Sequence, residues 1–68
     1  MKIEEAIVYC LALSGRGMCA EQIADMINWQ RLFVRKDGNS VTSAQVYRIV
    51  CMYPQVFSKA EGRIMLMI

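Results

Sequence analysis

Residues 42–54 read TSAQVYRIVCMYP, and this segment carries the clearest helix start in the chain. Thr42 and Gln45 fit a capping box, in which the Thr42 hydroxyl accepts a hydrogen bond from the Gln45 backbone N–H and the Gln45 side chain reaches back. Four apolar residues then recur at spacings of three and four, which predicts one buried stripe: Val46, Ile49, Val50 and Tyr53. Pro54 disfavours helical geometry at the residue before it. The segment therefore predicts a helix over about 43–53.

The residues after this helix predict a β-hairpin. Residues 56–58 and 63–67 are the candidate strands, and they flank a four-residue turn, 59–62, in which Gly62 stands last. In the second strand and just beyond it, Ile64, Leu66 and Ile68 alternate with Arg63, Met65 and Met67. Because side chains alternate between the two faces of a strand, one face of the hairpin is expected to pack against the helices.

Two further helices are predicted before residue 42, over 2–14 and about 20–29. Both segments place apolar residues three and four apart, and Gly15 is expected to end the first helix. In the second helix, Ile23, Ala24, Met26 and Ile27 are expected in the core, and Glu21, Gln22, Asp25 and Asn28 are expected to face water. Residues 30–41 break the helical pattern, and we expect there a short extended arm over 32–34 and a tight turn around Gly38.

The predicted order of elements is helix, helix, long loop, capped helix and hairpin. This is the order of a winged helix-turn-helix. We therefore expect a mainly α fold with a small β-hairpin, an α+β fold in which three helices precede a C-terminal wing. With 68 residues, the chain is expected to form a single domain over 1–68.

The composition excludes several classes of protein. Apolar residues make up 56% of the chain and charged residues 21%, whereas disordered tails are rich in charge and poor in aliphatic residues. No apolar run approaches the ~18 residues of a membrane span, and the start of the chain, MKIEE, does not resemble a secretory signal. Cys10, Cys19 and Cys51 show no C-x-x-C spacing and are expected to be reduced thiols. We expect a soluble, cytoplasmic protein without membrane contact.

The residue types present do not point to an enzyme. The chain has no histidine, which removes both the commonest general base and the commonest metal ligand. It also has no glycine-rich phosphate loop and no nucleophile elbow, and the neighbouring Glu4 and Glu5 point apart on a helix. We therefore expect no catalytic activity, no metal, no cofactor and no small-molecule ligand.

Charge is unevenly distributed along the chain. Residues 1–30 carry two basic and four acidic side chains, whereas residues 31–68 carry six basic and two acidic ones. A basic half is compatible with a polyanionic partner, and in this kind of fold the third helix enters the major groove of DNA. Arg48 is the candidate for a base edge, because its guanidinium matches the paired acceptors of guanine. The other candidates are Ser43, Gln45 and Tyr47 on the same helix, and, for phosphates, Arg35 and Lys36 in the 35–38 loop and Lys59 and Arg63 in the 59–63 wing.

Five short motifs occur together in this order: Ile23–Ile27 (IADMI), Phe33–Val41 (FVRKDGNSV), Ser43–Val46 (SAQV), Tyr53–Phe57 (YPQVF) and Gly62–Leu66 (GRIML). In this combination the chain resembles the HARE-type winged helix-turn-helix family over nearly its whole length. The resemblance implies a non-catalytic accessory module that binds double-stranded DNA and is associated with chromatin, transcription regulation or restriction.

Two apolar faces support a second interpretation. The residues expected on them are Tyr47, Cys51 and Met52 on the third helix, and Val8, Tyr9 and Ala12 on the first. A helix that reads a groove prefers polar groups at such positions, whereas aromatic residues and methionine are enriched at protein interfaces. The alternative to DNA binding is therefore a protein-interaction module or a homodimer that uses one of these faces.

Overall fold

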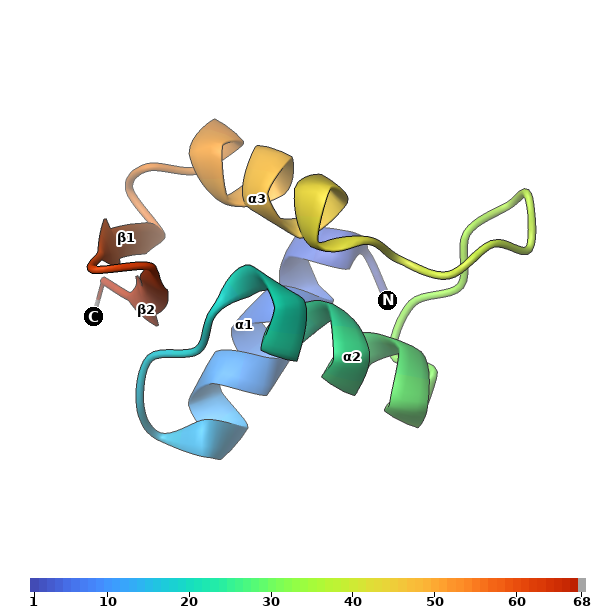
Figure 1. The fold of residues 1–68 in the computed structure, drawn as a ribbon, viewed down its shortest axis with the longest axis horizontal. Coiled ribbons are helices and arrows are strands. Elements are labelled where there is room, and N and C mark those ends of the chain that lie inside the picture. Colours follow the sequence, from blue (N-terminus) through green and yellow to red (C-terminus); the bar gives the residue numbers. More distant parts are fainter. Residues whose placement is uncertain (68) are drawn as a thin grey trace.

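Helices and strands form where the apolar spacing predicts them. The computed structural model describes residues 1–67, with α1 at Ile3–Ser14, α2 at Ala20–Gln30 and α3 at Ser43–Met52 (Figure 1). Two antiparallel strands follow, β1 at Phe57–Ala60 and β2 at Arg63–Leu66. Three helices followed by a two-stranded hairpin is the layout of a winged helix. The expected α+β fold is therefore confirmed.

The helix starts differ in part from the prediction. At α3 the Gln45 backbone N–H donates to Thr42 Oγ1 at 3.2 Å, as predicted. The Gln45 side chain does not complete the capping box, because its amide oxygen is buried without a hydrogen-bond partner. The reach-back hydrogen bond occurs instead at the other two helices, from Lys2 N–H to Glu5 Oε1 (3.0 Å) and from Cys19 N–H to Gln22 Oε1 (3.2 Å).

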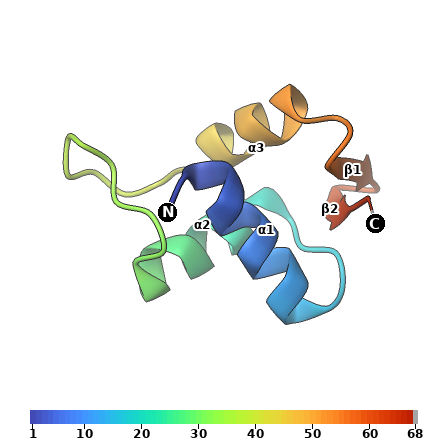
Figure 2. The same cartoon turned by 180° about the vertical axis from the view of Figure 1, so that it is seen from behind.

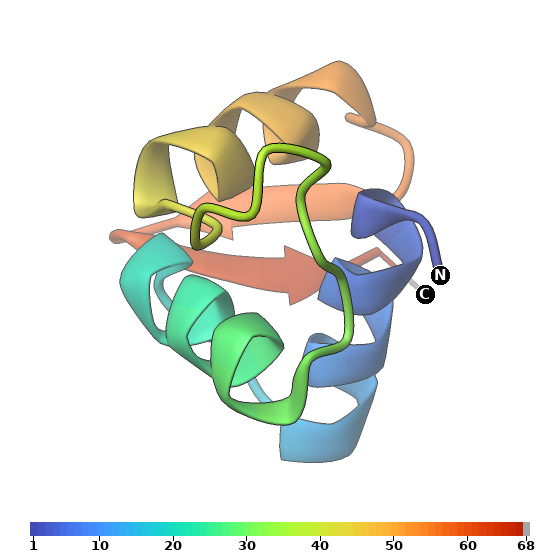
Figure 3. The same ribbon diagram turned by 90° about the vertical axis from the view of Figure 1, so that its right-hand side faces the viewer.

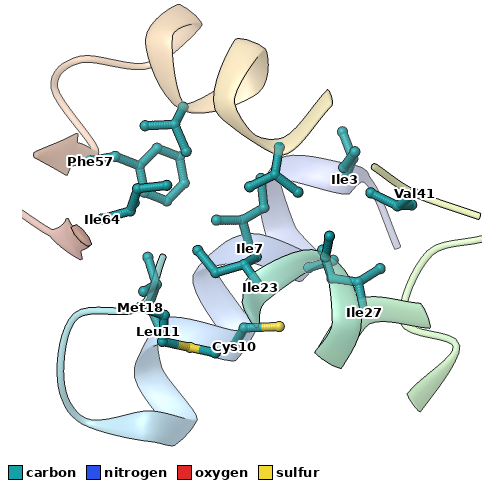
Figure 4. Close-up of a cluster of buried hydrophobic side chains, with 14 residues drawn as sticks. Ile3, Ile7, Cys10, Leu11, Met18, Ile23, Ile27, Val41, Phe57 and Ile64 are labelled. Carbon is teal, nitrogen blue, oxygen red and sulfur yellow. The ribbon is translucent and has the colours of Figure 1, made fainter. Parts of the chain in front are cut away.

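The buried core draws on all three helices, on both strands and on the segments between them (Figure 4). Its members are Ile3, Ala6, Ile7, Cys10, Leu11, Met18, Ile23, Ala24, Ile27, Val41, Val46, Val50, Phe57 and Ile64. α1 lies across one side of α2 and α3, in front of them in the view of Figure 2, and packs against both. Met26, expected in the core, is only half-buried, and Ile49 and Tyr53 likewise pack at the edge of the core.

Asn28 ties the end of the long connection between α2 and α3 back to α2. Asn28 Nδ2 donates to the Val41 carbonyl, and Asn28 Oδ1 accepts from the Val41 N–H, both at 2.9 Å. Asn28, expected to face water, is half-buried, and its amide provides the hydrogen-bond partners of the Val41 backbone. Residues 31–42 contain no helix or strand, and Phe33 packs against the core.

The hairpin turn is tighter than predicted. Ala60 pairs with Arg63, so only Glu61 and Gly62 connect the strands, in place of the expected four-residue turn. Both connecting residues have positive φ, 52° and 76°, as a type I′ turn requires. Glu61 adopts this geometry although it lacks the preference of asparagine or glycine for it. Ile68, expected to continue the alternation of the second strand, lies outside the described residues.

The hairpin is joined to the helices by backbone hydrogen bonds that the sequence did not predict. Met18, between α1 and α2, donates its N–H to the Ile64 carbonyl at 3.0 Å and accepts from the Ile64 N–H at 2.7 Å. This bridge gives β2 a second neighbour opposite β1. Viewed along the long axis, the hairpin lies at the end of the molecule away from the long loop (Figure 3). The bridge therefore fixes where the wing lies relative to α3.

Gly17 permits the close approach that the bridge requires. A Cβ at this position would lie 2.9 Å from Met65 Cγ and 3.3 Å from Arg63 Cβ. We expect Gly17→Ala to lower the free energy of unfolding by about 1–3 kcal/mol, since the added carbon overpacks the contact. Chemical denaturation measures this change. In a Met65→Ala background the cost should fall, and an equal cost in both backgrounds would contradict the contact.

Candidate nucleic-acid interface

The outer face of α3 is exposed because its opposite side is buried. Val46 and Val50 pack into the core, which turns Ser43, Ala44, Tyr47, Arg48 and Cys51 toward solvent. Within residues 1–67, Arg48 makes no side-chain hydrogen bond or ion pair. Its guanidinium therefore extends from the middle of α3 with all its donors available.

The hairpin contacts this face through a lysine. Lys59, on β1, places its ammonium 3.2 Å from Cys51 Sγ and 3.4 Å from Tyr47 Oη. The same ammonium lies 4.8 Å from the centre of the Tyr47 ring, within the range of a cation–π interaction. Hydrogen bonds to Cys51 and then to Tyr47 raise the pKa of Lys59 above its ordinary value of 10.5. We call this group of three residues the wing–helix contact.

Arg63 points to a different neighbour. Its Nη1 donates to the Gly17 carbonyl at 3.4 Å, in the turn between α1 and α2. Arg63 pairs with Ala60 at the end of the hairpin and is itself exposed. The two predicted wing cations therefore donate to different neighbours, Lys59 to α3 and Arg63 to the α1–α2 turn, although both line one hollow beside Tyr47.

The two predicted cations of the loop also differ from each other. Arg35 Nη2 forms an ion pair with Asp37 at 2.6 Å, and Arg35 Nη1 donates to the Ser40 carbonyl at 3.4 Å. The Asn39 backbone N–H, and then Arg35, hold the pKa of Asp37 below its ordinary value of 3.8. Lys36 is exposed. Arg35 thus closes the loop, and Lys36 extends from it.

The loop lies at one end of the long axis and the hairpin at the other, with α3 between them (Figure 1). The molecule extends 31 Å along this axis. The structure therefore brings Tyr47 and Lys59 together, places Arg48 on the same helix, and sets Arg35 and Lys36 at the far end. Gln45 is half-buried, so of the predicted α3 residues it presents the least surface.

One exposed residue was missed by the sequence interpretation. Trp29, near the end of α2, is 88% exposed, more than any other large apolar side chain of the described chain. The sequence does contain a pattern that predicts this exposure. Trp29 lies two positions after the buried Ile27, so it lies outside the apolar stripe of α2.

Other kinds of site find little support in residues 1–67. No three Cys, Asp or Glu side chains come together as a metal site would require. The three thiols are free, and burial raises the pKa of Cys10. In this part of the chain, no helix combines the length and apolar character needed to cross a membrane.

Comparison with protein-family models, with curated proteins and with solved structures gave no match. The resemblance to the HARE-type family therefore stays a prediction.

The wing–helix contact predicts how Lys59 titrates. Both hydrogen bonds favour the ammonium form, so the contact is complete below pH 10.5 and is lost as pH rises through the higher pKa of the folded chain. We expect Cys51→Ala to return the pKa of Lys59 toward 10.5, as measured by NMR titration of its Cε resonance. Ser43→Ala, on the same helix, should leave the titration unchanged. An identical titration in Cys51→Ala and the parent would refute the contact.

Proposed function

We propose that the chain binds double-stranded DNA, with α3 in the major groove and with the hairpin and the 35–38 loop on the phosphates. The observation that carries this proposal is the wing–helix contact. It holds a cation of the hairpin 3.4 Å from the Tyr47 hydroxyl, beside the exposed face of α3 that carries Arg48. Proteins of the helix-turn-helix kind dock with one helix in the groove and flanking cations on the backbone.

The geometry ranks the contacts within this proposal. Arg48 is the residue for a base edge, because all of its donors are available. Lys59 and Lys36 are the main phosphate contacts. Arg35 contributes less, since Asp37 neutralises its charge, and Arg63 contributes less, since it lies against the α1–α2 turn. Lys59 donates to Cys51 and Tyr47 but keeps its charge beside α3. Ser43 and Tyr47 complete the surface, and Gln45 stays at its edge.

The same proposal assigns no catalysis to the chain. In it the protein acts as a DNA-binding accessory module, and we assign it to transcription regulation or to DNA restriction on the strength of the HARE-type resemblance. The lack of a histidine supports a role in binding rather than in proton transfer.

The first test is fluorescence anisotropy of a labelled ~20 bp duplex at ~50 and ~200 mM salt. The logarithm of the binding constant falls with the logarithm of the salt concentration by about 0.9 per phosphate contact. Three or four cations on the backbone should therefore give a slope of about −3. Lys59→Gln should reduce the steepness of this slope by about one.

Arg48→Ala should weaken binding to a preferred duplex by about 1–3 kcal/mol, because a base contact is lost. Arg16→Ala is the matched control, since it removes an exposed arginine from the turn between α1 and α2. Both variants should have the same melting temperature as the parent chain. Equal losses in the two variants would place the DNA elsewhere.

The alternative is a protein-interaction module. Tyr47 and Met52 on α3 are 51% and 62% exposed, and Tyr9 on α1 is 40% exposed, which supports an apolar contact surface. Val8, expected on the α1 face, packs against the core instead. A chain that binds no duplex even at low salt would favour this alternative.

A further inference from the structure

The outer face of α2 carries a ridge of three exposed side chains. Glu21, Asp25 and Trp29 are spaced by four residues, so they lie one above the other on the helix. The opposite side of α2 is buried through Ile23 and Ile27, which fixes the ridge toward solvent. We call these three residues the α2 ridge.

The indole of the ridge stands next to a carboxylate. Asp25 and Trp29 line the same open hollow, of about 620 Å³, together with Met26, Asn28 and Gln30. Trp29 is 88% exposed, and tryptophan is enriched among the residues that contribute most to binding at protein interfaces. The hollow therefore offers an apolar ring with a negative group beside it.

The charges of the ridge have no partner within the chain as described. Among residues 1–67 the one ion pair joins Arg35 and Asp37, so neither Glu21 nor Asp25 is neutralised. Residues 1–30, which include α2, carry two basic and four acidic side chains, and the exposed Arg31 directly follows the helix. A cation-bearing partner complements this face, and the phosphates of DNA would be repelled by it.

We propose that the α2 ridge docks an arginine-bearing segment of a partner protein. A guanidinium suits the site better than an ammonium, because it stacks flat on an indole and forms two parallel hydrogen bonds with a carboxylate. One arginine lies against Trp29 and pairs with Asp25, and Glu21 attracts a second cation one turn away. The ridge shares no residue with the proposed DNA surface. The two partners can therefore bind the chain together.

The test uses the fluorescence of Trp29, which is the only tryptophan in the chain. We expect an oligoarginine peptide to change the Trp29 emission saturably, and added salt to weaken the effect, since exposed charges are screened. An oligoglutamate peptide of the same length should leave the emission unchanged. An unchanged emission with oligoarginine would overturn the proposal.

Three variants distinguish the ridge from general attraction to any exposed carboxylate of the chain. Asp25→Asn should weaken oligoarginine binding about two- to fivefold, the range expected for an exposed ion pair. Glu61→Gln is the matched control, since it removes one exposed carboxylate from the hairpin turn and should not change the affinity. Trp29→Ala, followed by calorimetry, should weaken binding about threefold or more, because the stacking surface is lost. Equal effects of Asp25→Asn and Glu61→Gln would overturn the proposal.

A second copy of the chain is the competing occupant. In that case the Trp29 emission would depend on protein concentration without any peptide, and sedimentation would show a dimer. This result would overturn the arginine-segment proposal. The affinity of Asp25→Asn for the DNA duplex, measured in parallel, should equal that of the parent chain. The peptide titration therefore tests the arginine-segment proposal, and the duplex titration tests the DNA-binding proposal separately.

Discussion

The paired backbone hydrogen bonds between Met18 and Ile64 are the constraint on which the placement of the candidate site depends. An isolated two-stranded hairpin is at best marginally stable, so the wing needs a further neighbour. Met18 supplies it at 2.7 and 3.0 Å, and Gly17 lets the two segments approach. Ile64 and Phe57 then enter the core beneath α3. In this position the hairpin brings Lys59 to the exposed side of the helix.

The elements of the fold were predictable because they depend on local spacing. Apolar residues at three and four positions identify each helix, and alternation identifies β2. Contacts between distant segments were not predictable in this way. Asn28 looks like a surface residue by its spacing, yet it pairs with Val41, and nothing local to residue 18 indicates the bridge to Ile64. The two-residue turn was missed because Glu61 is a poor residue for positive φ.

The sequence predicted which residues could belong to the candidate site, but it did not predict which of them lie close together in the folded chain. The sequence proposes Arg35 and Lys59 alike as phosphate contacts. In the structure Arg35 is ion-paired within its own loop, whereas Lys59 crosses to α3. The exposure of Trp29 was not predicted. The spacing of residues along a helix indicates which way a side chain points, but it does not indicate whether another segment of the chain packs against it. The result is a molecule with a basic α3–wing face and an acidic ridge on α2, which favours different partners for the two faces.

Chemical-shift mapping of the ¹⁵N-labelled chain with an unlabelled DNA duplex tests the central claim most directly. The account predicts that the backbone resonances of α3, of the hairpin around Lys59 and of the 35–38 loop shift on addition of the duplex. It also predicts that the resonances of Glu21, Asp25 and Trp29 do not. Shifts centred on α2, or no shifts at low salt, would contradict it.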